Sequence, residues 1–185
     1  MLRRPAIALL PEYIAALERG WSPDNMRGAQ AAAEQLNQIA RSPEDFITSR
    51  DDREAHGAPI QLPDGTTASR LPGFVRWIWD GAFCGSIGLR WQPGSAALPA
   101  HVLGHIGFAI VPWRRNAGHA TRALGLLLAD AKALGLPYVE LTADPENFAS
   151  RRVIEHCGGR LIERFQKIPA YGGAKALRFR IDLET

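Results

Sequence analysis

Apolar and polar residues follow one pattern before residue 73 and another pattern after it. Residues 74–79 and 82–91 are dense in aromatic and β-branched side chains, and an Asp-Gly pair separates the two stretches. Two strand-like stretches joined by Asp-Gly predict a β-hairpin. A further strand is predicted over His101–Val111, where apolar residues recur up to a proline.

Helical and strand patterns alternate after this third strand. From Gly118 to Leu134, apolar residues recur at helical spacing, and Gly135 follows at the position of a helix C-cap. The remaining predicted elements are a strand, a helix and two strands, at Leu136–Thr142, Asn147–Cys157, Arg160–Phe165 and Ala176–Leu183.

The N-terminal part of the chain has a helical and loop character. The spacing of apolar residues predicts helices over Pro11–Arg19 and Arg27–Ala40, and Ser42 precedes a proline as the N-cap of a third helix. Residues 51–72 are polar and rich in Gly and Pro, which predicts a long loop. The mixed order of elements predicts one domain over residues 1–185, of the α/β (α+β) class with a largely antiparallel sheet.

Composition narrows the class of protein. The chain has 185 residues, of which 46% are hydrophobic and 22% are charged, as in ordinary folded proteins. Its net charge of +3 suits a phosphorylated small ligand as well as nucleic acid, but no nucleic-acid-binding motif is present, so no such partner is predicted. No apolar run approaches the ~18 residues of a membrane span, and the spacing of histidines predicts no metal site. Cys84 and Cys157 are isolated, which predicts reduced thiols and a cytoplasmic location.

The clearest chemical feature is a basic turn between the strand that ends near Ile110 and the helix that begins at Gly118. The first N–H groups of a helix have no internal partner and carry partial positive charge, which suits a phosphate. Arg114 and Arg115 add positive charge, and small residues leave room for a close approach. The turn has neither the glycines of the dinucleotide fingerprint nor the Gly-Lys-Ser/Thr of a P-loop. The residues therefore predict a phosphate-binding turn of another kind.

Two landmarks resemble the Gcn5-related N-acetyltransferases, the GNAT family. Arg115, Gly118 and Ala120 form R-x-x-G-x-A, which is similar to the family's acyl-CoA motif Q/R-x-x-G-x-G/A. Within residues 144–159, Asp-Pro-Glu-Asn, Ser-Arg-Arg-Val-Ile-Glu and Gly-Gly follow one another, which resembles the family's Asn-x-x-Ser helix. This landmark is especially like that of ribosomal-protein N-terminal acetyltransferases and uncharacterised bacterial relatives, and the Gly-His-Ile-Gly of residues 104–107 resembles a strand of the latter group.

The resemblance implies a twisted, mixed but mostly antiparallel sheet flanked by helices, in which two central parallel strands splay apart. These strands would be His101–Val111 and Leu136–Thr142, and the co-substrate acetyl-CoA would enter the gap between them. Residues 73–185 would form the sheet core, and residues 1–72 would shape the acceptor site. The implied contacts to acetyl-CoA are Phe108, Ala109, Ile110, Arg115, Asn116, Ala117, Gly118, His119, Ala120, Thr121, Asn147 and Ser150.

The implied reaction is direct attack of an amine on the acetyl thioester in a ternary complex. The acceptor would be a primary amine of a small molecule or of a protein or peptide, and homodimer formation stays open. Many family members place a tyrosine seven positions after the asparagine as the acid for the thiolate, and Ile154 occupies that position in this chain. His105 and Glu140 are the candidate bases. The alternative is that His105 forms a structural hydrogen bond within its strand and that Glu140 faces solvent. The missing tyrosine leaves a second hypothesis open, a CoA-binding module on the same fold without turnover.

Overall fold

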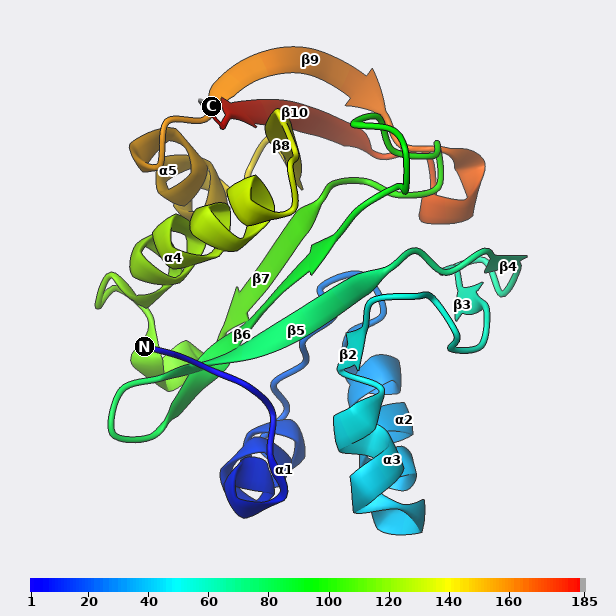
Figure 1. Cartoon of the computed structure of the whole chain (residues 1–185), viewed down its shortest axis with the longest axis vertical. Coiled ribbons are helices and arrows are strands. Elements are labelled where there is room, and N and C mark those ends of the chain that lie inside the picture. The colour runs from blue at the N-terminus through cyan, green and yellow to red at the C-terminus, as the bar shows by residue number, and fades with distance from the viewer. Residues whose placement is uncertain (184–185) are drawn as a thin grey trace.

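The computed structural model describes residues 1–183, which form two larger sheets with helices packed around them (Figure 1). The first sheet has the order β1-β5-β6-β7, with β2 beside β5, and all of these pairs are antiparallel. Its strands are β1 (Leu2–Arg3), β2 (Asp51–Asp52), β5 (Gly73–Trp79), β6 (Phe83–Arg90) and β7 (Ile106–Ile110). The predicted hairpin is confirmed as β5 and β6, and its turn contains Gly81 at a φ of 73°.

The second sheet has the order β8-β10-β9, also antiparallel. Its strands are β8 (Tyr138–Ala143), β9 (Arg160–Gln166) and β10 (Lys175–Asp182). A separate small hairpin pairs β3 (Ile60–Gln61) with β4 (Thr67–Ala68), inside the segment that was predicted as a loop. This hairpin forms because Asp64 accepts the Thr66 N–H at 3.0 Å and Gly65 adopts a φ of 85°, which together close a tight turn.

The helices agree with the sequence pattern to within a few residues. The N-terminal helices are α1 (Leu10–Glu18), α2 (Gly28–Arg41) and α3 (Pro43–Thr48), and the later ones are α4 (His119–Ala133) and α5 (Phe148–His156). Short 3-10 helices form η1 (Ile7–Leu9), η2 (Pro112–Arg114) and η3 (Pro169–Tyr171). The predicted cap of α3 is confirmed, since the Ser42 hydroxyl accepts the Asp45 N–H at 3.1 Å. Within residues 1–183, the helices are too short or too polar to cross a membrane.

Two apolar clusters hold these layers together. The first lies between one face of the first sheet and helices α1 to α3, where Tyr13 stacks on Trp77 with ring centroids 4.6 Å apart. The second surrounds α4, whose Leu124 and Leu127 are fully buried among side chains of both sheets. Because α4 packs on both sheets, this second cluster joins them across the place where the strands separate.

The junction between β7 and β8 is nearly open. The two strands form no ladder, and the His105 N–H donates to the Glu140 carbonyl at 2.7 Å just before β7 begins. The strand predicted over residues 101–111 starts later, at Ile106, because the Val102 N–H bonds to the Pro99 carbonyl at 2.9 Å and makes a turn. Beyond His105, β7 and β8 belong to different sheets, so a gap opens between them.

Candidate active site

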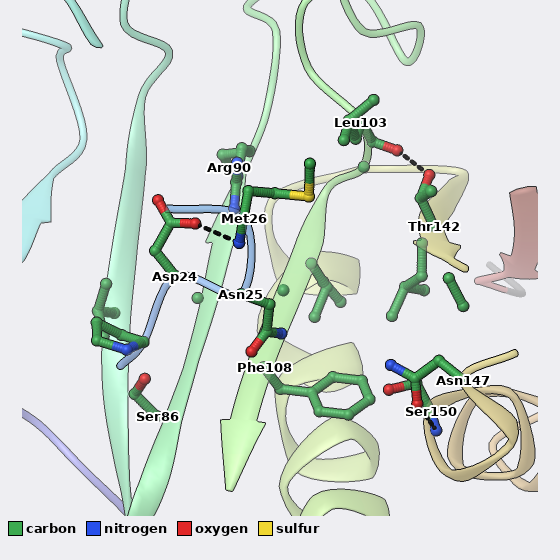
Figure 2. A pocket seen from close by; sticks show the side chains of 18 of the residues that line it. Asp24, Asn25, Met26, Ser86, Arg90, Leu103, Phe108, Thr142, Asn147 and Ser150 are labelled. Carbon is green, nitrogen blue, oxygen red and sulfur yellow. Dashed lines mark hydrogen bonds between the residues drawn. The ribbon is translucent and has the colours of Figure 1, made fainter. Parts of the chain in front are cut away.

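A cavity of about 370 Å³ lies where the two sheets separate, within the usual size range of small-molecule pockets. Strands β6 and β7 supply one wall, and β8 with α5 supplies the other. Residues 23–26, which connect α1 to α2, cover one end together with Tyr13 and Gln35. Figure 2 shows Asp24, Asn25 and Met26 of this connection lying over β6 and β7. The N-terminal helices therefore contribute directly to the cavity.

Hydrogen bonds between β6 and β7 show which edge of β7 faces the gap. At one end of the pair the Val111 N–H donates to the Cys84 carbonyl at 3.0 Å, and at the other end the Arg90 N–H donates to the His105 carbonyl at 2.9 Å. Bonded positions alternate along an antiparallel pair, so every second residue of β7 directs its main chain to β6.

The alternation assigns each main-chain group of β7 to one side. Gly107 and Ala109 face β6, whereas Ile106, Phe108 and Ile110 direct their N–H and C=O groups toward the gap. The predicted main-chain contacts to pantetheine are therefore feasible at Phe108 and Ile110. The main chain of Ala109 is paired with β6, so the register does not favour a main-chain contact to pantetheine at this residue.

The wall formed by α5 begins at Asn147, which caps the helix by accepting the Ser150 N–H at 3.1 Å. Asn147 and Ser150 both line the cavity, across from Phe108 of β7 (Figure 2). Ile154 follows one turn later, is 1% exposed and belongs to the apolar core. This wall thus offers two polar side chains and then an apolar surface.

The predicted phosphate turn lies at the C-terminal end of β7, outside the cavity lining. Asn116 and Gly118 both adopt left-handed backbone conformations, with φ of 61° and 74°. The first α-helical hydrogen bond of α4 runs from the Arg122 N–H to the Gly118 carbonyl at 3.0 Å. The three residues between Gly118 and Arg122 therefore have no helical acceptor for their N–H groups. This is the geometry of an anion site at a helix N-terminus.

In the predicted phosphate turn, the side chains of His119 and Arg115 are engaged with other groups, which leaves the main-chain N–H groups accessible to a ligand. His119 is 8% exposed, and its Nδ1 lies 4.0 Å from the Asp80 carboxylate. Arg115 donates from Nε to the Ile110 carbonyl at 3.4 Å, and Ala117 is exposed. His119 can accordingly serve a phosphate through its N–H and not through its imidazole.

Neither predicted base lines the cavity. His105 is fully buried, and its Nδ1 accepts the Glu140 N–H at 3.0 Å. Burial lowers the pKa of the His105 imidazole, an effect that the nearby Glu140 charge opposes. The Glu140 carboxylate accepts from Arg180 at 2.6 Å and lies 3.8 Å from Arg178. These contacts join β8, β10 and the start of β7, so the geometry gives no support to the predicted base role of either residue.

Several charged side chains of the cavity were not found from the sequence. They are Asp24, Arg50, Arg90, Asp144 and Lys167. Two of them had a local signal. Asp144 opens the Asp-Pro-Glu-Asn landmark, and at Asp24 the sequence Ser-Pro-Asp favours a turn in which the carboxylate accepts a following N–H, here that of Met26 at 2.8 Å. The others come from strands and loops far apart in the sequence, and only the fold brings them together. In the described part of the chain, His, Cys, Asp and Glu side chains form no group of three that could hold a metal ion.

Comparisons with known proteins give a family and a set of similar folds. The acetyltransferase (GNAT) domain family matches residues 19–160. Proteins with curated functions give no match to the sequence.

Solved structures with similar folds include RimL, a ribosomal L7/L12 α-N-protein acetyltransferase in complex with coenzyme A, at a TM-score of 0.66 and 10% identity over 98% of this chain and 93% of that chain. The microcin C7 self-immunity acetyltransferase MccE, in complex with acetyl-CoA and AMP, gives a TM-score of 0.64 and 12% identity over 98% and 91% of the two chains. A chimera of the spermidine N-acetyltransferase SpeG from Vibrio cholerae with hSSAT gives a TM-score of 0.61 and 13% identity over 99% of this chain and 96% of that chain. At these identities the likeness concerns the fold.

Proposed function

This chain belongs to the GNAT acetyltransferase family, and from that premise we propose that it moves an acetyl group from acetyl-CoA to a primary amine of a small molecule or a protein. The observation that carries the proposal is the arrangement of one gap. The main-chain edge of β7 and the polar start of α5 border the space where the two sheets part, and the start of α4 follows at the C-terminal end of β7.

In this proposal acetyl-CoA lies along the gap like an added strand. Its pantetheine amides pair with the main-chain groups of Phe108 and Ile110, which face away from β6. Its pyrophosphate accepts from the N–H groups of residues 116–121, where α4 adds partial positive charge. Asn147 and Ser150 line the channel nearer to the thioester. The ligand would thus span from the exposed turn to the cavity.

The proposed reaction is a direct transfer of the acetyl group from the thioester to the amine. An amine entering beneath residues 23–26 attacks the thioester carbonyl carbon with its lone pair, a C–N bond forms, and the C–S bond breaks. The amine nitrogen loses a proton and the departing thiolate gains one. At the position where the family usually supplies a tyrosine, Ile154 is buried and apolar. We therefore propose that positioning of the amine against the thioester supplies much of the rate.

Free-thiol release tests this function. The purified protein is incubated with acetyl-CoA and a panel of amines and peptides, and its melting temperature is measured with and without CoA. We expect release with at least one amine and a higher melting temperature with CoA. A CoA-dependent rise in melting temperature without thiol release for any amine would instead identify a CoA-binding module without turnover.

A further inference from the structure

Arg90 occupies the end of the cavity away from the phosphate turn, and it is the last residue of β6. We propose that the acceptor is a small primary amine that also bears a carboxylate or a phosphate, and that Arg90 binds this anionic group. The inference rests on the proposed function, because it places the anion beside an amine that awaits acetylation. It narrows the acceptor from amines in general to anionic amines.

The backbone directs the Arg90 side chain over β7. A Cβ built on Gly107 would lie 3.4 Å from Nη2 of Arg90, so the guanidinium group lies over a residue that has no side chain. Gly107 precedes Phe108, whose main chain faces the gap. An anion held by Arg90 would therefore lie about one residue along β7 from the proposed path of pantetheine.

Other charges of the cavity leave Arg90 available. Asp24 accepts the N–H groups of Met26 and Arg27 at 2.8 and 3.0 Å, which fixes it as the cap of a turn. Asp144 accepts from the Lys167 ammonium group at 2.6 Å. Both carboxylates that line the cavity are thus engaged within the protein.

Arg90 itself has no hydrogen bond from its side chain and no carboxylate within 4.0 Å, as far as residues 1–183 show. The Asp24 carboxylate is a charged group close enough to act on it, and Figure 2 shows Arg90 near Asp24 and Met26. Arg50 also lines the cavity, and its guanidinium donates to the Ser49 hydroxyl at 2.8 Å and not to a carboxylate. The acceptor end therefore presents two arginines that form no ion pair with a described residue, and the carboxylate near Arg90, that of Asp24, already accepts two main-chain N–H groups.

A guanidinium group that forms no hydrogen bond or ion pair within residues 1–183 favours an anion as ligand. Its fork of N–H groups matches the two oxygens of a carboxylate or phosphate, and bonds between charged groups are about twice as strong as neutral ones. A purely cationic amine would instead meet positive charge at the same end. The volume of about 370 Å³ suits a small molecule that carries both groups.

Matched pairs of amines test the inference. L-amino acids are compared with their amides, and O-phosphoethanolamine with ethanolamine, so that the two arms separate carboxylate from phosphate. Binding to the CoA-saturated protein is measured by calorimetry, and thiol release is measured with acetyl-CoA. We expect an anionic member to bind and react about tenfold or more better than its neutral partner.

Variants of Arg90 assign that preference to one side chain. Arg90→Gln should remove the preference for the anionic member, mainly through KM, and Arg90→Lys should retain part of it. Arg164→Gln, on the exposed face of β9 and outside the cavity, serves as the matched control and should keep the wild-type preference.

The two readouts separate failure of this inference from failure of the proposed function. Equal binding of anionic and neutral members, no binding of any anionic member, or an unchanged preference in Arg90→Gln would each overturn the inference. Binding of an anionic member that depends on Arg90, without thiol release from any amine, would support the anion site and overturn the transferase proposal.

Discussion

Gly118 shows how one residue sets the proposed phosphate site. It adopts a φ of 74°, and a Cβ built on it would meet nothing within 4 Å, so the space in front of the turn is open. Gly135, at the other end of α4, has the same properties, with a φ of 77° and nothing within 4 Å. Gly118 is the N-cap of α4 and Gly135 follows its C-cap, and only Gly118 has a proposed phosphate as its neighbour.

Gly118→Ala should weaken CoA binding about tenfold, because the methyl group occupies the approach of the pyrophosphate. Gly135→Ala is the matched control, since both substitutions carry a backbone cost of about 1–2 kcal/mol for a left-handed alanine. Calorimetric titration of CoA and urea unfolding measure the two effects. Equal CoA affinity in the two variants would place the pyrophosphate elsewhere.

His105 should make stability depend on pH. Burial lowers the pKa of the folded imidazole below the ordinary value of about 6.5, so the unfolded chain takes up the proton first as pH falls. Neutral His105 therefore contributes its full stabilisation above pH ~6.5. Between this pH and the lower pKa of the folded imidazole, the free energy of unfolding falls by at most about 1.4 kcal/mol per pH unit.

Urea unfolding between pH 7.5 and 5 checks this dependence. His105→Gln should flatten the fall in stability at acidic pH, because the titrating group is gone, although the variant is also less stable at neutral pH. His156→Gln, which changes an exposed histidine, should keep the wild-type slope. A parallel pH profile for wild type and His105→Gln would mean that other groups cause the dependence.

The structural role of His105 could not be read from its neighbours in sequence. The alternation of residues placed it on a strand, but its burial depends on β8, where Tyr138 lies 6.1 Å from its ring and Glu140 donates to it. Arg90 and Lys167 were missed for the same reason, since neither lies in a local motif. By contrast, the phosphate turn was predicted because its glycine, its arginines and the helix start are contiguous.

At the scale of elements, β7 has one edge bonded to β6 and one edge facing the gap. The N–H groups of Phe108 and Ile110 face the gap, and those of Gly107 and Ala109 face β6. Hydrogen exchange should therefore alternate along this strand. Acetyl-CoA should slow exchange at Phe108 and Ile110, by about 100-fold at 100 times Kd, while the other two amides stay protected in both states. Unchanged exchange at Phe108 and Ile110 in the presence of bound ligand would refute the added-strand arrangement.

The residues that follow β8 and β9, Asp144 and Lys167, form an ion pair whose two side chains differ in burial. The Lys167 side chain is 4% exposed, whereas the Asp144 side chain is 56% exposed. Asp144→Ala should cost about 3 kcal/mol, the lower end of the range for a broken buried pair, because it leaves a buried ammonium group without its acid. Lys167→Met should cost only about 1 kcal/mol, since an apolar chain of similar length fills the space.

The double variant separates charge from packing in this pair. If the unpaired ammonium group causes the loss, Asp144→Ala combined with Lys167→Met should be more stable than Asp144→Ala alone. Urea unfolding at neutral pH measures all three proteins. A double variant that is less stable than both single variants would show that the carboxylate stabilises the chain by another contact.

Elements whose residues carry a continuous local pattern were predicted more accurately than elements that depend on contacts with distant residues. Helix α4 carries its apolar spacing and its terminal glycine in one continuous segment, so both of its ends were found to within a residue. The start of β7 was placed too early, because the turn at Val102 depends on a hydrogen bond that the residue pattern does not encode. The small hairpin of β3 and β4 was missed because its strands have only two residues each.

At the scale of the whole molecule, the chain is organised around a break between two sheets. The cluster around α4 joins the sheets on one side, and the cavity lies in the break itself. Helices α1 to α3 cover one face of the first sheet (Figure 1), and Tyr13, Gln35 and residues 23–26 close one end of the cavity. The family resemblance is clear in the sheet core, where both motifs lie, and faint in residues 1–72, which contribute these residues to the cavity.

The same break gives the molecule a mechanical seam. Strand β1 near the N-terminus belongs to the first sheet, and β10 near the C-terminus belongs to the second, so tension between the two ends must cross from β7 to β8. Ladders within each sheet resist with many hydrogen bonds. The seam relies on apolar packing and a few bonds, among them the two between His105 and Glu140 and the one from the Thr142 hydroxyl to the Leu103 carbonyl. In an optical trap the protein should yield first at this seam, and acetyl-CoA, by bridging β7 to α5, should raise the force at which it parts.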